Sequence, residues 1–195
     1  MRARVRTHVA RVGRAAGAAL TTTFSCGPSA APLPHSRRPL PSAGSDWRAI
    51  PGAAVWVSEG SDGAVFCCNA GGAAFRLGPD RVNWQQLGGA GITHISVGDA
   101  QNVVALAGGL AFRHTPANND WARMPGDGGF TRISISSGGG RIVALAAGGR
   151  ALAFDGGAWQ PLPAPALESI DVGEGSLVAA AMGSYEIFVM QLPSH

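Results

Sequence analysis

The chain has 195 residues, of which 46% are hydrophobic and 14% are charged, and its formal net charge is +3. The positive charge lies at one end, because residues 1–45 hold seven arginines and no acidic residue, whereas residues 46–195 hold eight arginines and all twelve acidic residues. The larger part is therefore mildly acidic, which argues against nucleic-acid binding, and no apolar stretch is long enough to predict a membrane span.

Residues 1–45 are predicted to be a disordered leader. Residues 1–27 combine arginine with alanine, valine and threonine, which is the composition of an organellar transit peptide. Prolines follow up to residue 45 and predict an extended linker. The alternative is a leader without a targeting role. The protein would then belong to the cytoplasm or the extracellular space. Residues 46–192 are expected to form the folded domain, and residues 193–195 a short tail.

Tryptophan recurs at a nearly constant interval after this linker. Trp47, Trp84, Trp121 and Trp159 are 37, 37 and 38 residues apart. Each repeat also holds a stretch like Ile-Ser-Val-Gly and a Gly-Gly or Gly-Ser pair between two apolar runs. The Ile-Ser-Val-Gly-like stretches are residues 57–60, 95–98, 133–136 and 170–173, and the glycine pairs are residues 71–72, 108–109, 148–149 and 183–184. The chain is therefore expected to be a repeat protein with four copies.

Four short antiparallel strands are expected in each repeat. A glycine pair between apolar runs is typical of a two-residue β-hairpin turn, because glycine tolerates positive φ angles. The Ile-Ser-Val-Gly-like stretch and the tryptophan run add one strand on either side of this hairpin. Four strands that recur in this way are typical of a β-propeller blade. The aromatic residues that follow the glycine pairs, Phe75, Phe112, Phe154 and Phe188, are expected in the core.

The order of the strands favours a closed ring. A lone strand at residues 47–50 precedes three complete sets, and three further strands end at Gln191. We therefore expect an all-β propeller of four blades, in which the N-terminal Trp47 strand joins the last three strands and closes the ring. The alternative is an open arc or a fragment that pairs with another chain. The protein is accordingly expected to be either a monomeric ring or a paired arc.

These repeats resemble tectonin repeats. The resemblance rests on Ile-Pro-Gly at residues 50–52 and Met-Pro-Gly at residues 124–126 after a tryptophan, and on Ile-Ser-Val-Gly at residues 95–98. It covers about residues 46–192, although only Asn69 is kept from the Trp-Gly-Val-Asn pattern of the family's second strand. The resemblance implies a tectonin β-propeller that acts as a lectin and binds glycans at repeated weak sites between blades. The alternative that it implies is a protein–protein interaction scaffold of the tectonin-repeat adaptor type.

Eight residues are candidates for ligand binding. An indole offers a flat apolar platform and one N–H donor, which suit a sugar ring, and short amides and carboxylates suit sugar hydroxyls. The candidates are Trp56, Trp84, Trp121, Asn83, Asp99, Asn102, Asn119 and Asp120. Each type also has a structural interpretation, because repeated tryptophans anchor blades and Asn and Asp favour turns. Trp56 occurs in one repeat only, which favours a ligand role for it more than for the repeated tryptophans.

The sequence contains no recognisable catalytic constellation. It has no lysine, which excludes a Walker-type phosphate loop, and no nucleophile, base and orienting group recur together. His94 and His114 have no cysteine or carboxylate at a metal-binding spacing. Cys67 and Cys68 are expected to be buried thiols that form no disulfide. The sequence therefore predicts a non-enzyme without cofactor or metal.

Overall fold

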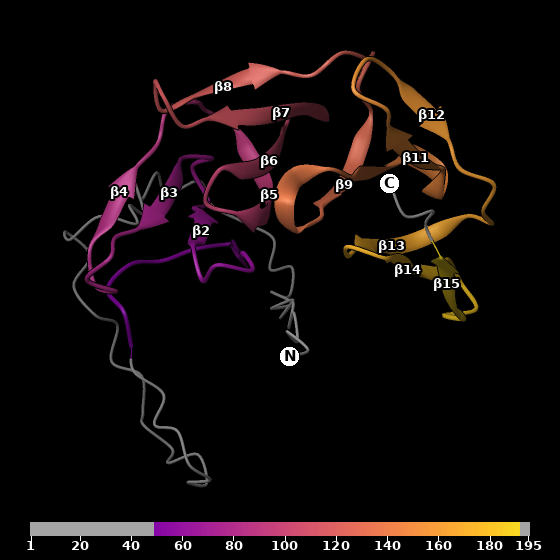
Figure 1. The fold of residues 1–195 in the computed structure, drawn as a ribbon, viewed down its shortest axis with the longest axis horizontal. Coiled ribbons are helices and arrows are strands. Elements are labelled where there is room, and N and C mark those ends of the chain that lie inside the picture. The colour runs from indigo at the N-terminus through magenta and orange to yellow at the C-terminus, as the bar shows by residue number, and fades with distance from the viewer. Residues whose placement is uncertain (1–48, 192–195) are drawn as a thin grey trace, which may run out of the picture.

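The computed structural model describes residues 49–191, which form fifteen β-strands and two short 3-10 helices. The strands make four antiparallel sheets, which we name A to D in chain order. Figure 1 shows these sheets side by side along an open arc, with sheet A at one end and sheet D at the other. The predicted all-β fold with one sheet per repeat is confirmed in this part of the chain.

Neighbouring strands in each sheet are consecutive in the chain. Sheet A holds β1 (Trp56–Glu59), β2 (Val65–Cys68), β3 (Ala74–Leu77) and β4 (Trp84–Gln86). Sheet B holds β5 (Ile92–Asp99), β6 (Asn102–Ala107), β7 (Leu110–Thr115) and β8 (Asp120–Arg123). Sheet C holds β9 (Phe130–Ile135), β10 (Ile142–Ala146), β11 (Ala151–Phe154) and β12 (Trp159–Pro161), with the helices η1 (Ser137–Gly139) and η2 (Ala147–Gly149) at its turns. Sheet D holds β13 (Leu167–Val172), β14 (Ser176–Ala181) and β15 (Ile187–Gln191).

Within a sheet, the burial of the second strand shows which faces of that sheet are covered. All five residues of β10 are buried, because sheets B and D lie on either side of sheet C. In β14 of sheet D, buried residues instead alternate with half-buried or exposed ones. Successive side chains of a strand point to opposite faces, so this alternation means that only one face of sheet D is covered.

The core consists of apolar clusters between successive sheets. Sheets A and B share a cluster that includes Phe66, Ile92, Ile95 and Val103. Sheets B and C share one that includes Val104, Leu106, Ile133 and Ile142. Sheets C and D share one that includes Val143, Leu145, Ile170 and Leu177. We call each of these contact zones between neighbouring sheets a seam, and the fold depends on three of them.

Glycine pairs occupy the hairpin turns, as predicted. Gly108 and Gly109 connect β6 to β7 with φ angles of 57° and 75°, and Gly148 and Gly149 connect β10 to β11 with φ angles of 77° each. A side chain would strain the backbone at positive φ, so these turns require glycine. Cys67 and Cys68 are buried, as predicted.

The expected aromatic repeat is shifted by two residues in sheet C. The hairpin register places Phe112 opposite Ala105 in sheet B, and at the corresponding place in sheet C it sets Leu152 opposite Ala144. Phe154 lies two residues further along the same face of β11, where it packs half-buried against the cluster between sheets B and C, so its expected place in the core is confirmed. In sheet D the aromatic residue is in register, yet Phe188 is 40% exposed because it lies on the outermost strand.

The expected ring closure involves residues outside the described range. Trp47 lies outside residues 49–191, and residues 49 and 50 are not part of a strand. Sheet D has three strands in the described part of the chain, and no apolar cluster there joins sheet D to sheet A. The described residues therefore form an open arc. The predicted leader (residues 1–45) and tail (residues 193–195) also lie outside them.

Within residues 49–191, no helix has the length and hydropathy needed to cross a membrane.

Gly98 tests how closely the sheets approach at a seam. A Cβ atom at this position of sheet B would lie 2.1 Å from the carbonyl oxygen of Ser136 in sheet C. We therefore predict that Gly98→Ala lowers the free energy of unfolding by about 3 kcal/mol, because backbone must move to accept the methyl group. Thermal and urea unfolding measure the change. Gly140→Ala is the control, since a Cβ atom there would meet nothing within 4 Å, and equal stability of both variants would contradict the close approach.

Candidate functional site

Three tryptophans on the outermost strands donate to the connection that precedes their own sheet. The indole Nε1 of Trp84 donates to the carbonyl oxygen of Pro51 at 2.8 Å, and that of Trp121 donates to the carbonyl oxygen of Gly88 at 2.7 Å. Trp159 donates to Pro125 in the same way. Each acceptor lies four residues after the tryptophan of the preceding repeat. The N–H group that would have served a ligand at Trp84 and Trp121 is therefore bonded within the protein.

Trp56 belongs to a different group on the concave side of the arc. Trp56, His94 and Arg132 occupy equivalent positions in β1, β5 and β9, and the latter two strands lie on the concave side in Figure 1. The Trp56 indole donates to the carbonyl oxygen of Ile95 at 2.8 Å and its ring centroid lies 4.0 Å from that of His94. The guanidinium of Arg132 lies 5.7 Å from the centre of the Trp56 ring, a cation–π arrangement.

His94 is held neutral in this group. Burial, followed by the positive charge of Arg132, lowers the pKa of His94 from 6.5 to about 4. Its Nε2 atom lies 3.0 Å from the carbonyl oxygen of Ile133, which can only accept, so Nε2 carries the proton. At neutral pH, Trp56 and His94 therefore form an uncharged aromatic pair with Arg132 as the charged member.

Asp99 and Asn102 come together, as neighbours in one turn. The Asp99 carboxylate accepts hydrogen bonds from the side chain and backbone of Asn102, from the backbone of Gln101 and from the backbone N–H of Gly138 in sheet C. These bonds, the Asn102 side chain first, lower the pKa of Asp99. Arg113 donates to the Asn102 side-chain oxygen at 2.7 Å. The network holds the turn and connects sheets B and C.

The remaining polar candidates lie near the outermost strands. Asn83 donates from its side chain to Asp80 at 2.6 Å, within the turn before β4. Asn119 has a φ angle of 57° and donates to the carbonyl oxygen of Gln86 at 3.4 Å, while the Asp120 carboxylate accepts from the backbone N–H of Trp121. The eight candidates thus fall into separate groups, and each described polar side chain among them has a turn or a neighbouring strand as its partner.

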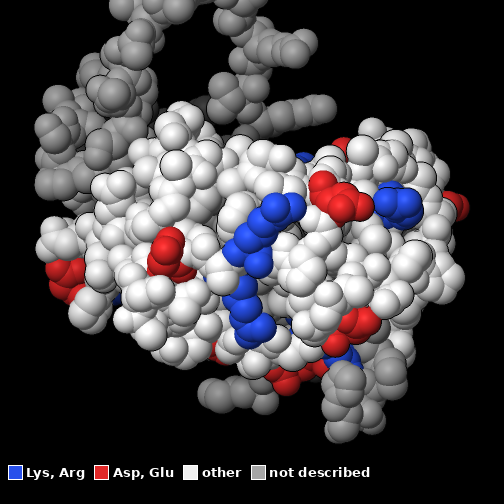
Figure 2. Space-filling model, turned by 90° about the horizontal axis from the view of Figure 1, so that it is seen from above, with Lys and Arg blue, Asp and Glu red and all other residues white. Residues whose placement is uncertain are grey.

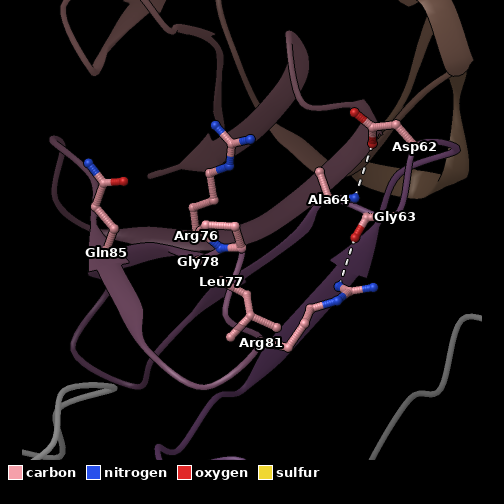
Figure 3. A pocket seen from close by; sticks show the side chains of 9 residues that line it. Asp62, Gly63, Ala64, Arg76, Leu77, Gly78, Arg81 and Gln85 are labelled. Atoms are coloured by element: carbon pink, nitrogen blue, oxygen red, sulfur yellow. Dashed lines mark hydrogen bonds between the residues drawn. The ribbon is translucent and has the colours of Figure 1, made fainter.

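The sequence did not indicate a cavity on sheet A. It has a volume of about 490 Å³, and Asp62, Arg76, Arg81 and Gln85 are among its lining residues. Figure 3 shows that these side chains come from different turns and strands around it, with Arg81 donating to the carbonyl oxygen of Gly63. The guanidinium of Arg76 lies 5.6 Å from the centre of the Phe66 ring. No sequence spacing marks this cavity, because the fold alone brings these side chains together.

Charge does not concentrate on the outer surface. Figure 2, seen from above, shows a mostly uncharged face with one short basic stripe and separate acidic patches. This face therefore offers no broad basic surface. Among residues 49–191, no three His, Cys, Asp or Glu side chains are grouped so that they could hold a metal ion.

The end of the arc at sheet A exposes a repeat position that is buried elsewhere. Val57 in β1 is 49% exposed. The equivalent residues of β5, β9 and β13 are Ile95, Ile133 and Ile170, and they are 0%, 2% and 9% exposed. Each of these isoleucines faces the preceding sheet, and sheet A has none before it in the described residues. Val57 and its neighbour Val55, 57% exposed, therefore form a small exposed apolar edge on β1, whereas Cys67 and Phe75 on the same face of sheet A are 0% and 4% exposed.

Sheet D, at the other end of the arc, also exposes a repeat position that is buried in the other sheets. Val178 in β14 is 43% exposed, and its register partner Val189 in β15 is also exposed. The equivalents of Val178 in β2, β6 and β10 are Phe66, Val104 and Val143, and none is more than 2% exposed. These three face the following sheet, which sheet D lacks in the described residues. Val178, Ile187 and Val189 form the uncovered D face.

Comparison with known proteins defines the fold. No family model matches the sequence, and no curated protein matches it. Human WBSCR16 is a structural match with a TM-score of 0.59 and 13% identity, over 75% of this chain and 50% of its own. Prp20p from Saccharomyces cerevisiae matches with a TM-score of 0.54 and 12% identity, over 73% and 47%. YCF48 from Cyanidioschyzon merolae matches with a TM-score of 0.52 and 18% identity, over 67% and 48%.

The described residues form a β-propeller fold. These structural neighbours are β-propeller proteins, and their low identity to this chain establishes the fold alone. The chain spans about half the length of each neighbour. The arc in Figure 1 thus matches about half of each of these propellers.

Trp121 tests the structural role of the outer tryptophans. Its side chain packs against the cluster between sheets A and B and donates to Gly88. We predict that Trp121→Ala lowers the free energy of unfolding by about 3 kcal/mol, and that Trp121→Phe, which keeps a ring but loses the donor, costs about 1 kcal/mol. Chemical denaturation measures both changes. An alanine variant as stable as the parent would show that the indole does not connect the sheets.

His94 makes stability depend on pH. Because the pKa of His94 is about 4 in the folded protein and 6.5 ordinarily, only the unfolded chain binds a proton between these values. The free energy of unfolding is therefore at its full value above pH 6.5 and falls as the pH drops towards 4, by up to about 3 kcal/mol. Denaturation across this range measures the slope. His94→Gln should flatten it, leaving the part due to His114, whose pKa is also lowered by burial; an unchanged slope would contradict this role.

Proposed function

We propose that this chain is a protein-interaction module of the β-propeller type, which binds a protein partner through the apolar side chains that are exposed at the ends of its arc. One observation carries the proposal: Val57 and Val178 are about half exposed although the same positions are buried at every seam in the described residues. Covering such apolar surface is favourable by about 25 cal/mol per Å², and exposed apolar patches mark interaction sites. The ends of the arc are therefore suited to a folded protein surface.

One structural neighbour binds proteins, which supports a protein partner for this chain as well. A structure of yeast RCC1 (Prp20) shows it bound to Kap60, with a TM-score of 0.52 to this chain, and a second structure of Prp20p is described together with its binding to Gsp1p and histones. These partners are those of Prp20. For this chain, they support the class of function, a propeller that binds proteins.

A glycan-binding lectin is the alternative, favoured by the resemblance to tectonin repeats. The described candidates offer it little, because the indoles of Trp56, Trp84 and Trp121 donate to backbone carbonyls. Asp99 and Asn102 likewise bond to each other. A protein partner, bound at apolar faces, needs none of these groups. The assignment to the tectonin family belongs to this lectin alternative, and so does a closed ring in which residues 47–50 pair with the last strands and complete the fourth blade.

We also propose that the module is not an enzyme. His94 and His114 are buried, and the hydrogen bond to Ile133 and the ring contact with Trp56 occupy His94 in a structural role. Neither histidine is thereby offered to a substrate as a general base.

Two experiments on the full chain separate the two functions. We predict no saturable, sugar-competed binding on a glycan array. We further predict that a protein partner captured by cross-linking in the native cell is lost with Val57→Asp or Val178→Asp, because each substitution places a charge in an apolar face. Val82→Asp is the matched control, since Val82 is 38% exposed but lies in the turn before β4. Sugar-competed array binding, or equal capture by all variants, would contradict the proposal.

A further inference from the structure

One repeat position carries an arginine in both sheet A and sheet B. Arg113 in β7 is opposite Val104 in β6, and Arg76 in β3 is likewise opposite Phe66 in β2. The guanidinium of Arg113 donates to the side-chain oxygen of Asn102 at 2.7 Å. The two arginines occupy equivalent places in their sheets, so a difference between them comes from what surrounds each guanidinium.

Sheet A lacks the acceptor that Arg113 uses. Asn102 lies two residues before Val104, and the residue two before Phe66 is Ala64. The methyl group of Ala64 accepts no hydrogen bond, fills less space than an amide side chain, and lines the cavity on sheet A. The cavity thus borders the place that an asparagine side chain occupies in sheet B.

The guanidinium of Arg76 has no oxygen acceptor in the described part of the chain. Its contact there is with the Phe66 ring, whose centre lies 5.6 Å away, and a ring attracts the cation without supplying an oxygen to its five N–H donors. Asp62 also lines the cavity, but it accepts from the backbone N–H groups of Ala64 and Ala100 at 3.0 Å and 2.9 Å. A half-buried cation with open donors therefore lines this cavity.

We propose that this cavity binds a carboxylate group, which Arg76 holds in place of the missing asparagine oxygen. A guanidinium presents its donors as a planar fork, and a carboxylate accepts two of them at once. Gln85 is opposite Arg76 in the neighbouring strand and lines the cavity, so its amide N–H can donate to the same group. Figure 3 shows the two side chains rising from the sheet in the same direction. This site does not depend on the apolar ends of the arc and goes beyond the proposed function.

The charges around the cavity favour a ligand with a single negative charge. The charged lining residues are Arg76, Arg81 and Asp62, whose net charge is +1. Arg81 is already engaged, because it donates to the carbonyl oxygen of Gly63 and lies 3.9 Å from the carboxylate of Glu59. One cation therefore remains for the ligand. A carboxylate balances this charge, whereas a phosphate dianion would exceed it beside two acidic side chains.

The cavity has room for the group that carries the carboxylate. Its volume of about 490 Å³ lies within the range of small-molecule sites, and Leu77 and Pro79 add apolar contact to its lining. A carboxylate on a short apolar stem fits this combination. Small organic acids and the aspartate and glutamate side chains of a protein partner share this chemistry, and binding measurements separate the two sources.

Nitrogen-15 NMR of the full chain, with acetate as the probe and chloride to keep the ionic strength constant, tests the site. The Nε–H signal of Arg76, assigned by its loss in Arg76→Gln, should shift saturably. Ala64→Asn should weaken the binding more than about 10-fold at unchanged net charge, because the new amide oxygen occupies the guanidinium as Asn102 does in sheet B. Arg150→Gln is the control, since it removes an exposed arginine outside the cavity lining and should bind as the parent does.

Two further probes identify the ligand. A tripeptide with a central glutamate and blocked ends that binds more tightly than acetate assigns the carboxylate to a protein partner, whereas equal binding assigns it to a small acid; both support the site. Should Ala64→Asn not fold, Arg76→Gln should abolish the shift of the Gln85 side-chain amide instead. A shift that does not saturate, a shift that these variants leave unchanged, or inorganic phosphate that binds more than about 10-fold more tightly than acetate overturns the proposal.

Discussion

The packing of one small sheet against the next is the interaction on which this structure depends. A four-stranded sheet of this chain has apolar side chains on both faces, and each face is buried only by a neighbouring sheet. A single blade could not keep its apolar surface from water, whereas a row of blades can. The consequence is that apolar burial is complete inside the row and incomplete on sheet D, the last described sheet. Val143 and Val178 illustrate this, because they occupy the same repeat position and differ only in whether a further sheet follows.

The polar residues of the seams serve the same packing. The outer indoles bond to carbonyls of the preceding connection, the inner serines accept from the following strand, and Asp99 joins the turns of sheets B and C. Each bond crosses a seam and fixes the position of one sheet relative to the next. Residues that resemble a ligand site in the sequence are thus used in assembling the blades. In the proposed function, recognition uses surfaces that the assembly of the blades does not use, at the ends of the arc.

The sequence predicts the repeating unit well and the assembly poorly. The spacing of Trp84, Trp121 and Trp159 and the glycine pairs predict the strands and hairpins, because turn geometry is a local property. The acceptor of each indole lies about one repeat away, so no local pattern reveals that its N–H is bonded. The side chains around the cavity, Arg76 and Arg81 among them, meet only in the folded sheet. The number of blades in a ring depends on the angle at each seam, which the period of the sequence does not contain.

Hydrogen–deuterium exchange, followed by mass spectrometry on the dilute full chain, tests the dependence on the seams most directly. Amides of β6 and β10, whose sheets are covered on both faces, should exchange slowest, and those of β1 and β14 faster. Equal protection of all four strands in the dilute protein would contradict the claim that the ends of the arc are uncovered.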